Sequence, residues 1–165
     1  MSCDIRIVEL QRDAIKADGV LVLEDGTLLA RVTGWTSILF HLDELMEPLH
    51  HAPRLNDVEF TADVARSHHQ RLIREVVRML CAGVVHGDLS EYNILIGSDG
   101  PVIIDLPQAV DAAGNNHAAR MLLRDVDNLR DFFGRFAPEL LATEYGPEIW
   151  ALYARGLLRV DSVLT

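Results

Sequence analysis

The sequence predicts an α+β fold that is mainly helical, and three observations support this prediction. Residues 61–82 place apolar side chains at helical spacing, which predicts a long amphipathic helix. Between residues 84 and 105 the pattern changes to short aliphatic runs separated by turn residues, which is typical of strands. Helical spacing returns over residues 116–133. Long helices on both sides of short strands predict one mixed domain over most of the chain.

The start of the chain, residues 1–51, is expected to form a small unit of its own. Two apolar runs, 20–23 and 28–32, flank Asp25-Gly26. Asp-Gly between apolar runs is a strong signal for a β-hairpin, because both turn positions need a positive φ. The sequence therefore predicts a two-stranded hairpin in this unit.

A short helix is expected to follow this hairpin. Ser37 is a suitable cap for a helix that runs to about Met46, and Pro48 then ends it. The apolar face of so small a unit must pack against something. A homodimer through the N-terminal unit is one arrangement that satisfies this need.

Residues 52–165 are expected to form the second domain, whose first helix is the best defined. Thr61 is placed to cap this helix, which runs to about Ala82, and Gly83 can end it in a left-handed conformation. Two aliphatic runs then flank the turn 97–100, which predicts a second hairpin.

The remainder of this domain is expected to be helical. Asn115 or Asn116 can cap a helix that runs to about Phe133. Two shorter helical pieces are expected at 138–141 and 147–158.

Composition excludes several classes of protein. The chain has 165 residues, a net charge of −10 and one lysine, Lys16, so no broad cationic field exists to collect nucleic acid. Cys3 and Cys81 are the only cysteines, which disfavours a disulfide scaffold or a thiolate zinc site. No apolar run reaches the roughly 18 residues that span a bilayer. We expect a soluble, cytoplasmic protein that binds neither membrane nor nucleic acid.

Three oxygen-bearing side chains of the second domain carry the functional prediction. Asp88 and Asn93 lie in the polar segment His-Gly-Asp-Leu-Ser-Glu-Tyr-Asn, and Asp105 ends the strand that follows. One hairpin holds all three, so their oxygens can converge on Mg²⁺, which prefers oxygen ligands. In kinase chemistry the first Asp accepts the hydroxyl proton, while the Asn and the second Asp hold the metal. Taken alone, an Asp followed by Asn is more often a capped turn.

The segment from His86 to Asn93 resembles the catalytic loop of RIO-type atypical serine/threonine protein kinases, which has Gly where ordinary kinases have Arg. Residues 103–108, Ile-Ile-Asp-Leu-Pro-Gln, resemble the metal-binding segment of the same family. Residues 52–58 resemble its stretch after the interlobe hinge. Arg124-Asp125-Val126 with the later Asp-Phe-Phe resembles one of its helices. Four ordered matches are more specific than any one of them.

This resemblance implies a protein-kinase-like C-lobe that uses ATP and Mg²⁺ to phosphorylate a protein substrate. It implies that Asp88 is the general base and that Asn93 and Asp105 hold the metal and the nucleotide. Ser90 would lie near the phosphates. Family members also carry phosphate on the metal-binding Asp, which implies a hypothesis of ATPase-like turnover through Asp105. Small-molecule phosphotransferases share His-Gly-Asp, but Ser-Glu-Tyr before Asn93 favours the RIO assignment.

One departure supports an alternative function. A kinase N-lobe needs a glycine-rich loop and a strand lysine that pairs with the phosphates. Residues 1–51 contain no suitable glycine cluster, and Lys16 lies outside any Val-Ala-x-Lys strand. A non-catalytic pseudokinase or binding module is therefore the second candidate.

The histidines are expected to have structural rather than catalytic roles. The imidazole of His86 is expected to be buried and to brace the polar loop, although its ordinary pKa also suits an acid or base. The adjacent pairs His50-His51 and His68-His69 are expected at the surface, because neighbouring side chains point apart on a helix or strand.

Overall fold

The computed structural model describes residues 5–11, 18–23, 28–32, 52–106 and 108–165. The chain divides into two compact units, Met1–His51 and Ala52–Thr165, and each is considered by itself. The helix predicted for residues 37–46 lies outside the described residues, as do Lys16, Cys3 and the pair His50-His51.

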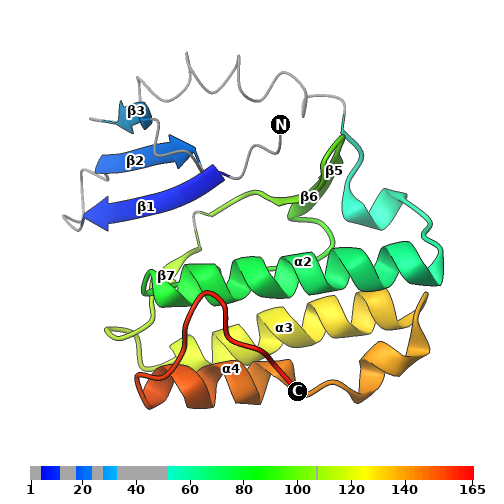
Figure 1. Cartoon of the computed structure of the whole chain (residues 1–165). Coiled ribbons are helices and arrows are strands. Elements are labelled where there is room, and N and C mark those ends of the chain that lie inside the picture. The colour runs from blue at the N-terminus through cyan, green and yellow to red at the C-terminus, as the bar shows by residue number, and fades with distance from the viewer. Residues whose placement is uncertain (1–4, 12–17, 24–27, 33–51, 107) are drawn as a thin grey trace. The chain divides into compact units, whose positions relative to one another are not determined.

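The first unit contains a three-stranded antiparallel sheet in the order β1-β2-β3 (Figure 1). Its strands are β1 (Ile5–Gln11), β2 (Asp18–Leu23) and β3 (Leu28–Val32). The β2–β3 pair confirms the strands of the predicted hairpin, and β1 is a third strand that was not predicted. The pairing of β1 shifts register between Ile7 and Glu9, so Val8 forms a bulge. That extra residue interrupts the alternation by which β1 could have been recognised.

The second unit begins with a short 3-10 helix, η2 (Leu55–Asp57), and then the long helix α2 (Ala62–Cys81). Thr61 caps α2 as predicted, because its side-chain oxygen accepts a hydrogen bond from the amide of Val64. Gly83 follows the helix with a φ of +81°, the left-handed conformation that ends many helices. Both ends of the predicted helix are confirmed within one residue.

Two small antiparallel pairs follow α2. Strand β5 (Ile94–Gly97) pairs with β6 (Gly100–Ile103) across a tight turn, which confirms the predicted hairpin. Strand β4 (Val84–Val85) pairs with β7 (Val110–Asp111), a strand that was not predicted. The β4–β7 pair brings the chain after Asp105 back to the start of the polar loop.

The rest of the unit is helical, with α3 (Ala118–Gly134), the 3-10 helix η3 (Pro138–Ala142) and α4 (Tyr145–Ala154). The predicted Asn caps of α3 were wrong. His117 occupies the cap position without a side-chain hydrogen bond, and Asn115 instead accepts a hydrogen bond from the amide of His117. The side chain of Asn115 therefore stabilises the turn before the helix rather than its first turn.

The three helices pack beside one another, and the β5–β6 hairpin lies on the side of α2 away from α3 (Figure 1). Their shared apolar faces form one core within the described residues, from Leu55 to Leu158. Trp150 packs partly buried against this core. The fold is α+β, as predicted. No helix in the described part of the chain combines the length and the hydropathy that a membrane span requires.

Candidate functional site

The polar loop, residues 86–93, connects β4 to β5 and fixes the backbone of Asp88 at two points. The amide of Asp88 donates a hydrogen bond to Nδ1 of His86 (3.3 Å), and its carbonyl accepts one from Nδ2 of Asn93 (2.7 Å). The Asp88 side chain itself is 64% exposed. The backbone of Asp88 is thus held in place while its carboxylate faces solvent.

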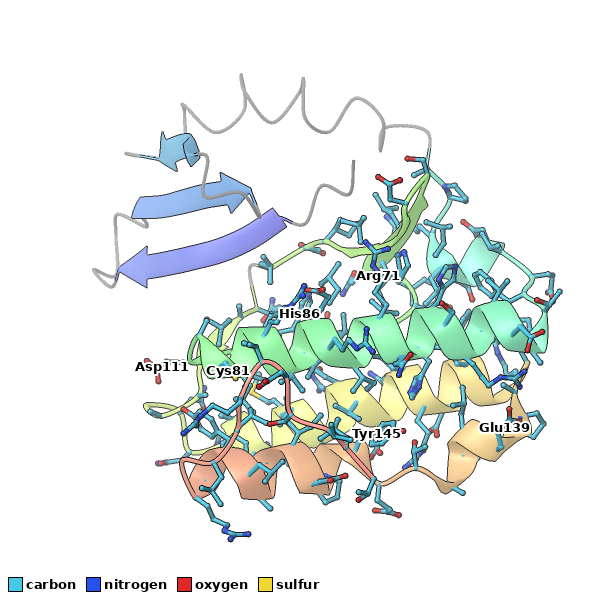
Figure 2. The ribbon with its side chains drawn as sticks, in the orientation of Figure 1. Arg71, Cys81, His86, Asp111, Glu139 and Tyr145 are labelled. Carbon is cyan, nitrogen blue, oxygen red and sulfur yellow. The ribbon has the colours of Figure 1, made fainter. Side chains whose placement is uncertain are left out.

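His86 connects the polar loop to the segment that carries Asp105. Its ring is buried, with 3% of the residue exposed, and Nε2 lies 3.1 Å from the carbonyl oxygen of Ile104. The Asp88 amide already donates to Nδ1, so Nε2 carries the proton that is donated to Ile104. The position of this histidine within the fold is visible in Figure 2. The prediction that His86 is buried and braces the loop is confirmed.

Asn93 holds the other side of this connection. Its backbone amide donates a hydrogen bond to the carbonyl of Ser90 (3.0 Å), which closes a turn. Its backbone carbonyl accepts a hydrogen bond from the amide of Ile104 (2.9 Å). Ser90 is half-buried within this turn. Asn93 therefore directly precedes Ile94, the first paired residue of β5, and Asp105 follows two residues after its partner Ile103, so both lie at the open end of the β5–β6 hairpin.

Asp105 has an unusual backbone conformation. Its φ is +66°, and it is the one non-glycine residue with a positive φ in the described part of the chain. Asp tolerates this left-handed region better than most residues but still at some cost. The turn directs the chain out of β6, and the Asp105 side chain is exposed.

Helix α3 supports the polar loop from below through a buried carboxylate. Asp125 is 1% exposed and accepts hydrogen bonds from the amides of Gly87 (2.7 Å) and Leu89 (3.0 Å). Burial raises the pKa of Asp125, and the two backbone hydrogen bonds oppose that rise. The carboxylate replaces water as the acceptor for two amides on either side of Asp88.

Two neighbours of Asp125 on α3 complete the support. Arg124 donates a hydrogen bond to the carbonyl of Gly87, and its guanidinium lies 4.0 Å from the Asp88 carboxylate. Asn128 donates a hydrogen bond to the carbonyl of Leu89 (2.8 Å). In the sequence, Arg124-Asp125 stood out only as part of a resemblance. A stronger signal was present, because Asp125 lies on the apolar face of α3 and a carboxylate there needs partners.

A shallow groove of about 230 Å³ lies beside the loop, further along α3. It is lined by Glu91, Asn128, Asp131, Phe132 and Arg135. The guanidinium of Arg135 lies over the Phe132 ring, 4.3 Å from its centroid. Charged and polar groups dominate this lining, so the groove lacks the apolar walls on which a purine ring would pack.

The side chains of the site suit a hard cation such as Mg²⁺. The hydrogen bond to Asp88 uses the side-chain amide nitrogen of Asn93, so the amide oxygen remains available to a cation. Asp105 adds an exposed carboxylate at the same end of the hairpin. Among the described residues, no group of three or more His, Cys, Asp or Glu side chains forms a metal cluster. Mg²⁺ commonly takes only one or two protein ligands together with phosphate and water, which is compatible with this pair.

The prediction that the pair His68-His69 lies at the surface was wrong. His68 is half-buried, and His69 is 1% exposed between the rings of Phe133 and Tyr145. Burial lowers the pKa of His69 to about 4, and its Nε2 has no hydrogen-bond partner within the described part of the chain. The signal was its spacing from Ala65 and Leu72, which places His69 on the apolar face of α2.

The fold and the loop now define a class of protein. The model of the RIO domain matches residues 44–145, which is 102 of the 165 residues and includes the polar loop, Asp105 and Asp125. The chain therefore belongs to the RIO-domain family.

Several curated relatives share this region. The RIO-type serine/threonine-protein kinase Rio1 of Methanocaldococcus jannaschii is 40% identical over 86 residues, which cover 51% of this chain and 28% of the relative. The protein of the same name from Haloferax volcanii is 49% identical over 65 residues, or 39% of this chain and 22% of the relative. The human serine/threonine-protein kinase RIO1 is 39% identical over 85 residues, or 51% and 15%. The chain thus spans less than a third of the length of these relatives.

Proposed function

We propose that this chain carries the catalytic C-terminal lobe of a RIO-type serine/threonine protein kinase, which transfers phosphate from Mg²⁺-bound ATP to a protein hydroxyl. The lobe would correspond to residues 52–165. The observation that carries the proposal is the set of hydrogen bonds that joins Asp88, Asn93 and the segment before Asp105 through His86. Relatives named as serine/threonine kinases share this region, which supports the same activity.

Asp88 is the general base in this proposal. A general base must approach the substrate hydroxyl within hydrogen-bonding distance, so it needs an accessible carboxylate in a fixed position. The Asp88 carboxylate is exposed while its backbone is held by His86 and Asn93. It can therefore accept the hydroxyl proton without reorganising the loop.

Asn93 and Asp105 would hold the cation, which neutralises the charge of the phosphates when it is bound. Ser90, in the same turn as Asn93, would lie near the phosphates. The left-handed backbone of Asp105 agrees with a functional constraint, because strained backbone often persists where a site requires it. An exposed Asp105 is also suited to accept phosphate itself, which would give ATPase-like turnover through an aspartyl-phosphate.

The decisive experiment is the titration of Mg²⁺-ATP into the chain by isothermal calorimetry, with Asp105→Asn as the variant. We expect magnesium-dependent binding that falls at least tenfold in the variant, because Asp105 is the only anionic one of the two proposed ligands and the substitution removes its charge. Asp99→Asn is the matched control, since Asp99 is also an exposed Asp of this hairpin and its side chain lies in the turn at the far end. Equal loss in both variants would contradict a specific role for Asp105.

A second candidate function follows from residues 1–51, which contain no glycine cluster and no strand lysine of kinase type. The chain would then be a non-catalytic binding module, in which the N-terminal unit mediates docking or a homodimer. Absence of binding at millimolar Mg²⁺-ATP would favour this module over the enzyme.

A further inference from the structure

Two arginines of α3 form a cationic strip next to Asp88, and we call Arg120 and Arg124 the arginine strip. Both residues are exposed. They are four positions apart on one helix, so their side chains lie on the same face. Arg124 is the nearer of the two, since its guanidinium lies 4.0 Å from the Asp88 carboxylate. The exposed His117, three residues before Arg120, extends the same face.

The charge of Arg120 is not neutralised by the described part of the chain. No carboxylate of those residues lies within ion-pair distance of it. Asp127, the next acidic residue along this side of α3, pairs with Arg130 at 2.8 Å. Arg120 is thus an exposed arginine without an ion pair to any described carboxylate. Its guanidinium therefore remains available to an external anion.

We infer that the arginine strip recognises acidic side chains that flank the phosphorylated serine or threonine, so that the substrate class is an acidic peptide segment. This inference rests on the proposed function, because it assumes that the substrate hydroxyl meets Asp88. Arginine binds carboxylates through paired N–H donors, which makes it suited to this recognition.

The spacing of the strip sets the position of the acidic residues. Four residues of helix rise about 6 Å, and an extended peptide advances about 3.3 Å per residue. Arg124 lies beside Asp88, so it would meet an acidic residue next to the phosphorylated position. Arg120 would meet a second acidic residue about two positions further along the peptide.

The same arginines do not favour a nucleic acid. Affinity for a polyphosphate backbone comes from many cations that release counterions together. This chain has a net charge of −10 and a single lysine, so a long polyanion would be repelled outside the strip. A short peptide with two or three acidic residues avoids most of that repulsion.

Binding of labelled peptides to the full chain, measured by fluorescence anisotropy, tests the inference without turnover. The probes are a serine peptide with Asp at the first and third flanking positions, and the same peptide with Asn there. We expect the acidic peptide to bind about fivefold more tightly, as one exposed ion pair of up to 1 kcal/mol allows. Arg120→Glu should remove that preference. Arg74→Glu, an exposed arginine of α2 with the same change of charge, should leave it unchanged.

A reversed charge pair makes the test specific. A peptide with Lys at the two flanking positions should bind Arg120→Glu more tightly than it binds the natural chain. Equal binding of the Asp and Asn peptides to the natural chain would overturn the inference. Tighter binding of a single-stranded RNA of equal charge, lost in Arg120→Glu, would also overturn it, because the strip would then be a general polyanion site.

The two proposals can fail separately. Phosphorylation of both peptides with equal kcat/KM would overturn the acidic preference and leave the kinase function intact. Binding of the acidic peptide through Arg120 without any phosphorylation would support the strip and contradict the catalytic proposal for this chain.

Discussion

The buried carboxylate of Asp125 supports the backbone around Asp88, the proposed general base, from outside the polar loop. Asp125 accepts hydrogen bonds from the backbone amides of Gly87 and Leu89, which flank Asp88 in the sequence. Leaving a buried amide without its acceptor lowers the free energy of unfolding by about 1–3 kcal/mol, so the two hydrogen bonds to Asp125 hold the loop strongly. Because the hydrogen bonds to the Asp125 carboxylate come from backbone amides, Asp125 acts as a positioning residue whatever side chains the loop presents.

His69 shows the opposite situation, a buried polar residue without a hydrogen-bond partner for Nε2. Burial lowers its pKa from 6.5 to about 4, so the folded chain keeps the ring neutral after the unfolded chain has taken up a proton. The free energy of unfolding should therefore fall as the pH drops from about 6.5 to about 4. Protonation of His69 should lower the free energy of unfolding by up to about 3 kcal/mol in total, as the change of its pKa from 6.5 to about 4 implies.

The variant His69→Phe tests this pH dependence. Phe keeps an aromatic ring against Phe133 and Tyr145 but cannot be protonated. Urea unfolding at pH 7 and at pH 4.5 should show a smaller loss of stability in the variant than in the natural chain. His69→Leu, which also cannot titrate, separates this effect from any misfit of the larger Phe ring. An identical pH dependence in all three proteins would show that His69 does not titrate as its burial requires.

The elements that could be predicted from the sequence are those whose local pattern and tertiary environment agree. Helix α2 has a cap at Thr61, an apolar face and a terminal Gly83, and each signal corresponds to an observed feature. Strand β7 has only two residues, and its partner β4 lies 25 residues earlier, so no local pattern could indicate it. Strand β1 was not predicted because its bulge interrupts the alternation of apolar side chains. The role of Asp125 was not predicted because its hydrogen-bond partners belong to a loop that is distant in the sequence.

Two glycines with nearly the same φ separate local backbone strain from packing at the polar loop. Gly83 has a φ of +81° and Gly87 a φ of +83°. A Cβ at Gly83 would have no atom within 4 Å. A Cβ at Gly87 would lie 2.5 Å from Cε of Met121 and 2.9 Å from the carbonyl oxygen of Gln108. The polar loop therefore packs closely at Gly87 against Met121 of α3 and against the backbone of Gln108, in the segment after Asp105.

Gly83→Ala should cost only the left-handed conformation, about 1 kcal/mol in the free energy of unfolding. Gly87→Ala should cost about 3 kcal/mol, because the collision with backbone adds to the same conformational cost. Urea denaturation of both variants measures the difference. Similar losses for the two would mean that the loop moves away from Gln108 easily, and the fixed position of Asp88 would then lose its basis.

At the scale of the whole molecule, the described site and core belong to residues 52–165. The polar loop, Asp105 and the supporting face of α3 all lie within this unit. The last segment of the chain also packs back onto the unit. Leu158 is buried, and the backbone amide of Thr165 donates a hydrogen bond to the carboxylate of Glu148 (3.0 Å). The C-terminal segment is therefore part of the folded unit.

Residues 52–165 should fold without the first 51 residues. The core from Leu55 to Leu158 is continuous within this unit, so we expect a single cooperative transition in urea, followed by circular dichroism. A shorter fragment, residues 52–154, removes the buried Leu158 and the partner of Glu148 and should lose about 2 kcal/mol of stability. A fragment 52–165 without a cooperative transition would mean that the first unit is needed for folding. Because the loop and its supports lie inside this unit, a folded fragment would retain the arrangement around Asp88 that the catalytic proposal requires.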